Sequence, residues 1–209
     1  MTNNKRVPKA TLQRYPIYLK ALRKLKSQDF TKILSSELSD YVAIESTTIR
    51  RDFSFLGTLG KQGYGYDIDN LIKIFETELG VNFDEKIILI GVGNLGKALL
   101  NYNRWNHVVG EIVCGFDIDP KIINSRNDVP VYHLDQLAEK MPANCRIAIL
   151  TISQNIQETV DKLVDCGIIG LVDFSNEHIR VPKNVTVKAI DVVSAIQELV
   201  FSTNFIEQQ

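Results

Sequence analysis

Three glycines near the middle of the chain have the spacing of a phosphate-binding turn. Gly91, Gly93 and Gly96 follow directly after the apolar run of residues 87–90. In such a turn the first glycine allows a tight bend and the second lets a pyrophosphate approach the backbone. The third lets the next helix pack closely against the strand, and the phosphates bind the N-terminus of that helix. The residues expected to hold the pyrophosphate are Gly91, Val92, Gly93, Asn94, Leu95 and Gly96.

An acidic residue completes the dinucleotide pattern. The apolar run of residues 112–116 ends in Asp117, which lies about 20 residues after the third glycine, where a carboxylate accepts hydrogen bonds from a ribose diol. We assign the neighbouring Ile118 to the same expected site. Because a carboxylate repels an additional 2′-phosphate, the pattern favours NAD(H) over NADP(H). The alternative is a plain glycine turn in an α/β protein.

Strands and helices must alternate around this turn to position it. Alternation of this kind predicts an α/β fold with a doubly wound parallel sheet of the Rossmann type. Ligands of such sheets cross the carboxyl ends of the strands, so we expect Thr151, Ile152 and Ser153 to line the pocket. Ser153 could also cap a helix that runs to about Cys166. The expected strands are residues 87–90, 112–116, 129–132, 147–151, 168–174 and 185–189.

The charge is distributed unevenly along the chain. Residues 1–66 contain 12 Lys/Arg against 5 Asp/Glu, whereas residues 67–209 contain 12 against 20. A basic first third indicates a polyanionic partner, although a chance difference between solvated faces remains the alternative. The chain has no apolar run of membrane length and its first residues lack the apolar segment of a signal peptide, so we expect a cytoplasmic protein without a membrane partner.

The basic third has the pattern of short helices. Apolar residues recur at helical spacing over residues 11–26. Pro16 fits this helix only if its first turn begins near Tyr15. Ser35 is expected to cap a second helix, and a connecting helix is expected over residues 69–79.

A third helix, over about residues 46–56, has one apolar and one polar face. Ile49, Phe53 and Leu56 recur at helical spacing and form the core face. Hydroxyl and guanidinium groups on the other face suit base edges and phosphates, as in the second helix of a helix-turn-helix. An ordinary solvated helix face is the alternative. The side chains expected to contact DNA are Ser46, Thr47, Thr48, Arg50, Arg51 and Ser54.

The glycine-rich segment of residues 57–66 follows the third helix. Its composition favours a β-hairpin wing that lies against a phosphate backbone, with Lys61 and Gln62 as contacts. A flexible linker between domains is the other interpretation. With the wing, the first domain would be a winged helix complete by about Asp67.

The last helix is expected over residues 191–205 and is rich in apolar residues. It can pack on its own sheet or on a partner subunit, and we favour the partner because so much apolar surface is unusual for a terminal helix. A catalytic group is harder to identify. His107, His133 and His178 are the only histidines, and none follows a strand end in a position suited to hydride transfer. A bound nicotinamide without catalytic groups indicates a sensor.

Taken together, these segments resemble the Rex family of bacterial redox-sensing transcriptional repressors. The resemblance runs through VPKATLQR, IRRDFSFLGTLGKQGYGY, IILIGVGNLGKALLNY, GFDIDP and AIDVVSAIQEL. It implies a homodimer with N-terminal winged helices, C-terminal Rossmann domains and a C-terminal helix exchanged between subunits. It also implies that the protein binds double-stranded operator DNA when free or bound to NAD⁺ and is released by NADH.

The resemblance also implies residues that couple the nicotinamide to the angle between the domains. At these positions the chain has Lys20, where the family often has arginine, Tyr102 after the glycine turn, and Asp191. Two further departures are Gln62, where arginine is common, and Ser153, where proline is common.

We therefore expect a winged-helix domain over residues 1–80, a Rossmann domain over 81–190 and a dimerisation helix over 191–209. The expected function is that of an NADH-responsive repressor that is not an enzyme and holds no metal. Two alternatives are an NAD-dependent oxidoreductase with an accessory N-terminal domain and a DNA-binding sensor of another adenine nucleotide.

Overall fold

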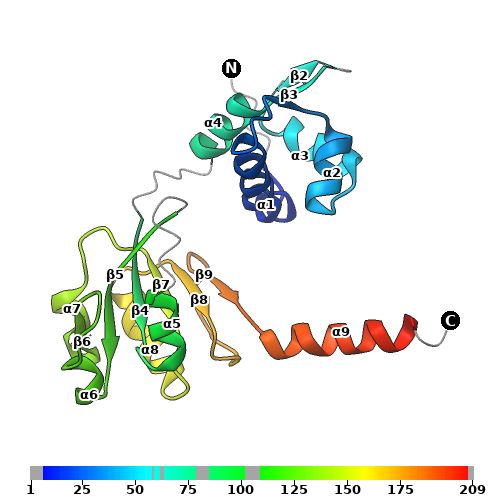
Figure 1. Cartoon of the computed structure of the whole chain (residues 1–209). Coiled ribbons are helices and arrows are strands. Elements are labelled where there is room, and N and C mark those ends of the chain that lie inside the picture. Colours follow the sequence, from blue (N-terminus) through cyan, green and yellow to red (C-terminus); the bar gives the residue numbers. More distant parts are fainter. Residues whose placement is uncertain (1–6, 58, 62–63, 79–84, 102–108, 207–209) are drawn as a thin grey trace. The chain divides into compact units, whose positions relative to one another are not determined.

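The computed structural model describes residues 7–57, 59–61, 64–78, 85–101 and 109–206. The chain divides into two compact units, Met1–Val81 and Asn82–Gln209. Each unit has its own hydrophobic core (Figure 1).

Unit 1 is a small bundle of helices with a short antiparallel sheet in the order β1-β3-β2. Its core contains aromatic rings in edge-on contact, such as Tyr18 with Phe53 and Tyr15 with Phe75. The strands β2 and β3 form the hairpin expected from the glycine-rich segment. The elements are α1 (Lys9–Lys26), β1 (Lys32–Ile33), α2 (Ser35–Val42), α3 (Ser46–Ser54), β2 (Gly60–Lys61), β3 (Gly65–Asp67) and α4 (Ile68–Glu78).

Two local expectations for unit 1 were wrong. The helix α1 spans Lys9–Lys26, close to the predicted residues 11–26, but it continues through Pro16, so the expectation that Pro16 requires a first turn near Tyr15 was wrong. Leu12 and Pro16 are both exposed, so water can reach the carbonyl that loses its helical donor at the proline. Ser35 is the first residue of α2 and not its cap, because Leu34 precedes the helix and its N–H donates to the Glu37 carboxylate at 2.7 Å.

Unit 2 is a parallel six-stranded sheet in the order β6-β5-β4-β7-β8-β9. This is the doubly wound α/β topology that the alternation of strands and helices predicted. The elements are β4 (Glu85–Ile90), α5 (Asn94–Asn101), β5 (Gly110–Asp117), α6 (Pro120–Ile123), β6 (Val131–His133), the 3₁₀ turn η1 (Leu134–Gln136), α7 (Leu137–Lys140), β7 (Ile147–Leu150), α8 (Ile156–Asp165), β8 (Gly170–Asp173), β9 (Thr186–Ala189) and α9 (Val192–Ile206).

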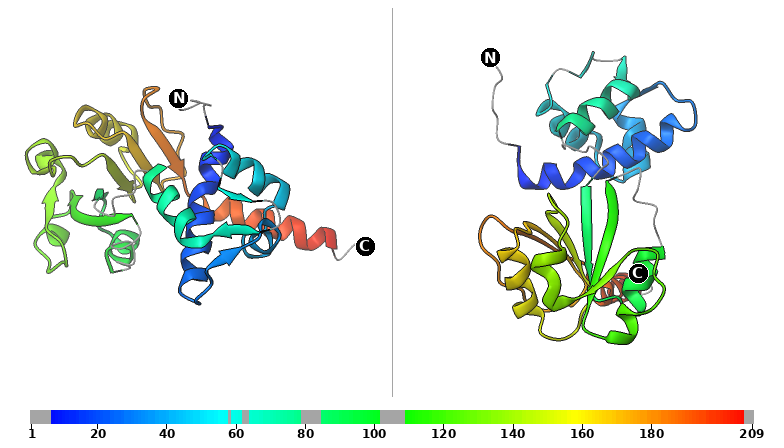
Figure 2. Two further views of the ribbon diagram at one scale, coloured as in Figure 1. Left: turned by 90° about the horizontal axis from the view of Figure 1, so that it is seen from above. Right: turned by 90° about the vertical axis from the view of Figure 1, so that its left-hand side faces the viewer.

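Both faces of the central strand β4 are buried, which explains its unbroken apolar sequence. Ile88 and Ile90 belong to the cluster that contains side chains of α7 and α8. Ile87 and Leu89 belong to the other cluster, to which α5 and α6 contribute. The right-hand view in Figure 2 shows α5 and α8 on opposite sides of the sheet.

Ser153 does not cap the helix that follows β7. The helix α8 begins only at Ile156, after Asn155, which has the left-handed backbone conformation with φ of 51°. Residues 153–155 form a bend before the helix starts, so Ser153 lies too far from the free N–H groups to cap them.

The helix α9 presents its apolar side chains to solvent in the single chain. Leu199 is 66% and Phe201 is 70% exposed. On the α5 side of the sheet, Ile147, Val172 and Phe174 are only partly buried. In the part of the chain that the structure describes, no helix is long and apolar enough to cross a membrane.

The two later glycines of the turn have different surroundings. A Cβ at Gly96 would lie 2.2 Å from the Gly91 carbonyl oxygen, whereas a Cβ at Gly93 would have no atom within 4 Å. The bare Gly96 backbone thus permits the close contact of α5 with the end of β4.

This contrast gives a prediction on stability. Gly96→Ala should lower the free energy of unfolding of unit 2 by about 1–3 kcal/mol, because the contacting atom is backbone and cannot move away cheaply. Gly93→Ala is the matched control and should leave that stability nearly unchanged. Thermal and urea unfolding followed by circular dichroism measures both, and equal stability of the two variants would contradict the prediction.

Candidate nucleotide site and DNA-binding surface

The carboxylate of Asp117 joins the end of β5 to the glycine turn. Its Oδ2 accepts a hydrogen bond from the Val92 N–H at 2.6 Å, and its Oδ1 accepts one from the Asp119 N–H at 2.9 Å. Each carboxylate oxygen has a second lone pair. Asp117 can therefore hold the turn in place and still accept hydrogen bonds from ribose hydroxyls.

The open side of the turn is where a ligand can approach the backbone. Gly93, Asn94 and Leu95 are exposed, and Asn94 begins α5. Because no protein atom would meet a Cβ at Gly93, the fold itself does not require glycine there. A group that approaches closely from outside, such as a pyrophosphate, supplies a reason for it.

The end of β7 forms the opposite wall of the turn. The Thr151 hydroxyl donates to the Gly91 carbonyl oxygen at 2.6 Å, and a Cβ at Gly91 would meet the Ile152 side chain at 2.7 Å. Ser153 is exposed on the following bend, and Ile118 is 60% exposed. A cavity of about 60 Å³ brings together members of the expected site, namely Gly91, Asp117, Ile118 and Ile152.

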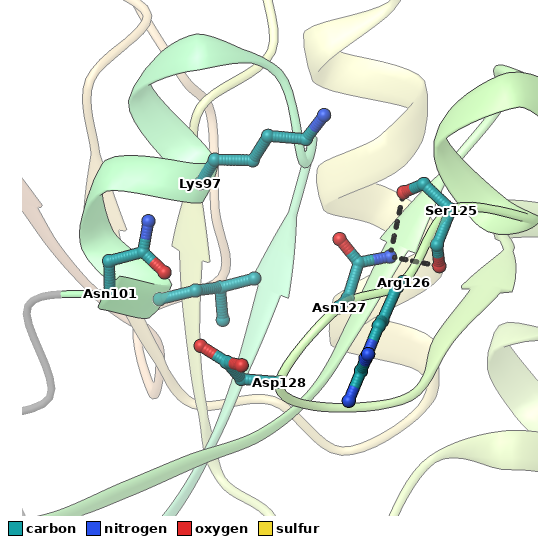
Figure 3. A pocket seen from close by; sticks show the side chains of 7 residues that line it. Lys97, Asn101, Ser125, Arg126, Asn127 and Asp128 are labelled. Carbon is teal, nitrogen blue, oxygen red and sulfur yellow. Dashed lines mark hydrogen bonds between the residues drawn. The ribbon is translucent and has the colours of Figure 1, made fainter.

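A larger polar depression, of about 220 Å³, lies beside the later part of α5 (Figure 3). Its lining shares no residue with the expected nucleotide site, so we do not assign the nucleotide to it. The lining residues are Lys97, Leu100, Asn101, Ser125, Arg126, Asn127 and Asp128.

The outer face of α3 has the polar character expected of a DNA-binding helix. Thr47, Arg51 and Ser54 are exposed, as is Arg50, while Ser46 and Thr48 are half-buried. Ile49 and Phe53 fill the core below, as expected.

The two arginines of α3 differ in their surroundings. Arg50 Nη1 donates to Ser35 Oγ at 3.0 Å and to Ser46 Oγ at 3.3 Å, which links the start of α2 to α3. Among the described residues, the Arg51 guanidinium has no hydrogen-bond or ion-pair partner. Arg51 is therefore the more available of the two for a phosphate or a guanine edge.

The remaining expected residues are placed only in part. The backbone of Lys61 belongs to β2 of the hairpin, whereas Gln62 and Tyr102 lie outside the described residues. Lys20 is exposed on α1. Asp191 precedes α9 and accepts hydrogen bonds from the Ser194 hydroxyl and N–H, and these bonds lower the pKa of its carboxyl below the usual value.

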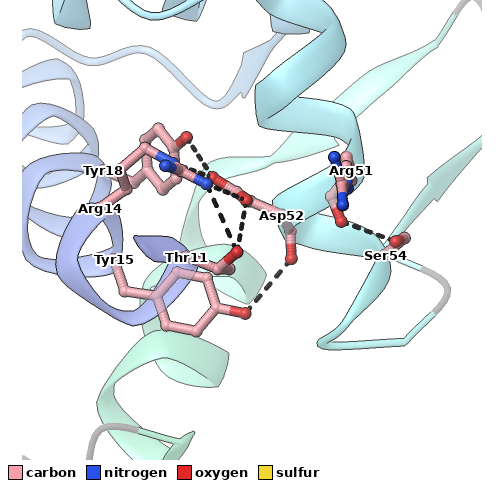
Figure 4. A network of polar contacts seen from close by, with 7 residues as sticks. All are labelled: Thr11, Arg14, Tyr15, Tyr18, Arg51, Asp52 and Ser54. Carbon is pink, nitrogen blue, oxygen red and sulfur yellow. Dashed lines mark hydrogen bonds and ion pairs between the residues drawn. The ribbon is translucent and has the colours of Figure 1, made fainter. Parts of the chain in front are cut away.

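Sequence reasoning missed a buried carboxylate behind the exposed polar face of α3 (Figure 4). Asp52 has a side-chain exposure of 1% and forms an ion pair with Arg14, whose Nε lies 2.6 Å from Oδ2. Burial raises the pKa of Asp52, but hydrogen bonds from Arg14, Tyr18 and Thr11 outweigh it and leave the pKa lowered. The sequence did indicate that Asp52 is buried, because this residue lies between the core positions 49 and 53 of the same helix.

Comparison with protein families agrees with the two-unit architecture. Residues 6–54 match the family described as "Putative DNA-binding protein N-terminus". Residues 82–176 match the family described as "CoA binding domain". The first match includes α1 to α3, and the second includes the glycine turn and Asp117.

Curated relatives match nearly the whole chain. The redox-sensing transcriptional repressor Rex of Anoxybacillus flavithermus is 41% identical over 198 residues, which cover 94% of this chain and 93% of the relative. The protein of the same name from Oenococcus oeni is 39% identical over 209 residues, with 96% of this chain and 95% of the relative covered.

Solved structures match over the same extent. The crystal structure of RSP in complex with β-NAD⁺ and operator DNA has a TM-score of 0.88 and 30% identity, and covers 97% of this chain and 94% of that one. The structure of RSP with β-NADH has a TM-score of 0.84 and 27% identity, with 98% of both chains covered. From these matches and the geometry of both units, the chain belongs to the Rex family of redox-sensing transcriptional repressors.

Proposed function

We propose that this protein represses transcription by binding double-stranded operator DNA when it is free or bound to NAD⁺, and that NADH releases it. One observation carries the proposal: a helix with an exposed basic face and a hairpin wing share a chain with a glycine turn held by Asp117. The structures of RSP with NAD⁺ and operator DNA and with NADH support it. Such a repressor acts in the cytoplasm, where its DNA and its cofactor meet.

The response must originate at the nicotinamide. NAD⁺ and NADH share the adenine, both riboses and the pyrophosphate, so contacts to these parts cannot discriminate between them. Lys20, Tyr102 and Asp191 are the residues that we assign to the response, by resemblance to the family. Lysine at position 20 keeps the positive charge of the family's arginine but not its bidentate geometry.

A homodimer explains the exposed apolar surface of unit 2. Two recognition helices must meet successive major grooves, about 34–36 Å apart, which requires two copies of the chain. The exposed side chains of α9 and the partly buried residues Ile147, Val172 and Phe174 supply two complementary apolar surfaces. We assign α9 of one subunit to cover the sheet of its partner.

The match to a CoA-binding family favours a second candidate function, that of a DNA-binding sensor of another adenine nucleotide. The glycine turn binds pyrophosphate and does not distinguish nicotinamide from other groups attached to it. Fluorescence or calorimetric titration of the purified protein with NADH, NAD⁺, coenzyme A and ATP separates the two candidates.

The proposed function predicts a loss of operator affinity with NADH. At saturating concentration, NADH should weaken operator binding about 10- to 100-fold, corresponding to a coupling of about 1–3 kcal/mol. Fluorescence anisotropy of a labelled operator duplex measures this, with NAD⁺ at the same saturation as the control. Equal operator affinity with both cofactors would contradict the proposal.

Asp117 should make the site selective for NADH over NADPH. Its carboxylate would lie beside the 2′-phosphate of NADPH and repel it. Calorimetry with both cofactors should show clearly weaker NADPH binding, and Asp117→Asn should reduce the difference. If the wild-type protein binds both equally, Asp117 does not contact the ribose.

Arg51 should contribute directly to operator binding. Arg51→Ala should cost about 1–3 kcal/mol if the side chain contacts a guanine edge. If it contacts only a phosphate, binding should weaken on all sequences and the salt dependence should become shallower. An unchanged affinity for operator and unrelated DNA would show that this face of α3 does not touch DNA.

The exposed face of α9 should mediate self-association. Leu199→Glu would place a charge in an apolar interface and should shift the protein toward monomer in sedimentation at micromolar concentration. Gln197→Glu adds the same charge to the same helix at an exposed position that does not neighbour Leu199, and is a control for charge alone. A Leu199→Glu protein that remains as dimeric as the wild type would argue against α9 as the interface.

A further inference from the structure

A buried carboxylate on α3 is connected to one face of α1. Thr11 Oγ1 donates to Asp52 Oδ1 at 2.9 Å, and Tyr18 OH donates to Oδ2 at 2.7 Å. Arg14 donates to both oxygens, through Nε at 2.6 Å and Nη2 at 2.7 Å. The Tyr15 hydroxyl lies 3.2 Å from the backbone carbonyl oxygen of Asp52. All four donors come from positions 11, 14, 15 and 18, which share one face of a helix.

An acid at this position is a costly way to pack two helices. Removing a carboxylate from water is strongly unfavourable, and apolar residues of similar volume often give equal or greater stability. Apolar contacts, however, leave helices freer to slide and rotate against each other, whereas a bidentate ion pair fixes distance and angle. The arrangement around Asp52 therefore specifies geometry more than it adds stability.

The geometry that it specifies is that of the DNA-binding face. Asp52 immediately follows Arg50 and Arg51, and the same nine-residue helix presents Thr47 and Ser54 to solvent. With 3.6 residues per turn, any rotation of α3 against α1 moves these exposed side chains sideways across a base edge. Hydrogen bonds to bases tolerate little such displacement.

We propose that Asp52, held by Arg14, Tyr18 and Thr11, is a positioning residue for operator recognition that sets the orientation of α3 without touching DNA. The proposal rests on the proposed function only in so far as α3 reads an operator. Its distinctive consequence is that loss of the network reduces sequence discrimination more than it reduces binding to DNA in general, because the phosphate-binding groups remain.

The test compares two variants with a matched control. Asp52→Asn removes the charge with little change in shape. The combined variant Arg14→Met, Tyr18→Phe and Asp52→Leu replaces the network by apolar side chains. It therefore distinguishes an effect on the orientation of α3 from an effect on the stability of the fold. Asp29→Asn is the control, because it removes the same charge from an exposed position. The φ of Asp29 is 65°, a backbone conformation that asparagine tolerates.

Binding is measured on a duplex that the full-length wild-type protein selects from a random pool, and on a shuffled duplex of the same length and composition. Thermal unfolding and NADH titration report on the fold of each unit. In both network variants, the ratio of selected to shuffled affinity should fall about 10-fold or more, the size of a lost base contact. Affinity for the shuffled duplex and its salt dependence should stay within about twofold of those of Asp29→Asn.

Several results would overturn the proposal. A stable apolar variant with the wild-type affinity ratio would show that the network serves stability alone, as would unfolding of unit 1 in both variants. A folded Asp52→Asn protein with an unchanged ratio would also contradict it. If the wild-type protein selects a DNA sequence but stays bound to it in the presence of NADH, the proposed function is overturned. The inference about Asp52 then still stands.

Discussion

A close contact between two pieces of backbone determines how unit 2 can bind a nucleotide. Because Gly96 has no side chain, α5 begins directly against the Gly91 carbonyl at the end of β4. This contact directs the N–H groups at the start of α5 toward the open side of the turn, where the helix dipole favours an anion. The Thr151 hydroxyl and the Asp117 carboxylate then hold the turn from β7 and β5. Three neighbouring strands thus fix the one loop to which we assign the pyrophosphate.

A second constraint operates in unit 1, where the recognition surface depends on how α3 packs. One side of α3 carries the buried Ile49 and Phe53, and the other carries exposed polar and cationic groups. Arg50 links α3 to α2, and Asp52 links it to α1. The two units therefore follow the same principle, since polar contacts inside each fold orient the groups that we assign to the nucleotide and to the DNA.

Much of the fold follows from the sequence, because burial on both faces of a parallel strand leaves a continuous apolar run such as Ile87 to Ile90. The parallel sheet, the hairpin wing and the core face of α3 were all predicted correctly. The helix ends were predicted incorrectly. Ser153 and Ser35 are residue types that commonly cap helices, but Asn155 and Leu34 are the residues that precede α8 and α2. Residue preference cannot locate a left-handed backbone or a Glu37 side chain that supplies the capping bond. Asp52 was missed because its partners lie 34 or more residues away in sequence.

In the proposed function, the state of the nicotinamide and the binding of operator DNA are coupled through one protein. Thermodynamic linkage makes any such coupling reciprocal, so operator DNA must weaken NADH binding by the same factor by which NADH weakens operator binding. The most direct measurement is the NADH dissociation constant, obtained by fluorescence titration with and without a saturating operator duplex. We predict weaker NADH binding with operator, by about 10- to 100-fold. Equal dissociation constants would show that NADH is not the effector and would favour a sensor of another adenine nucleotide.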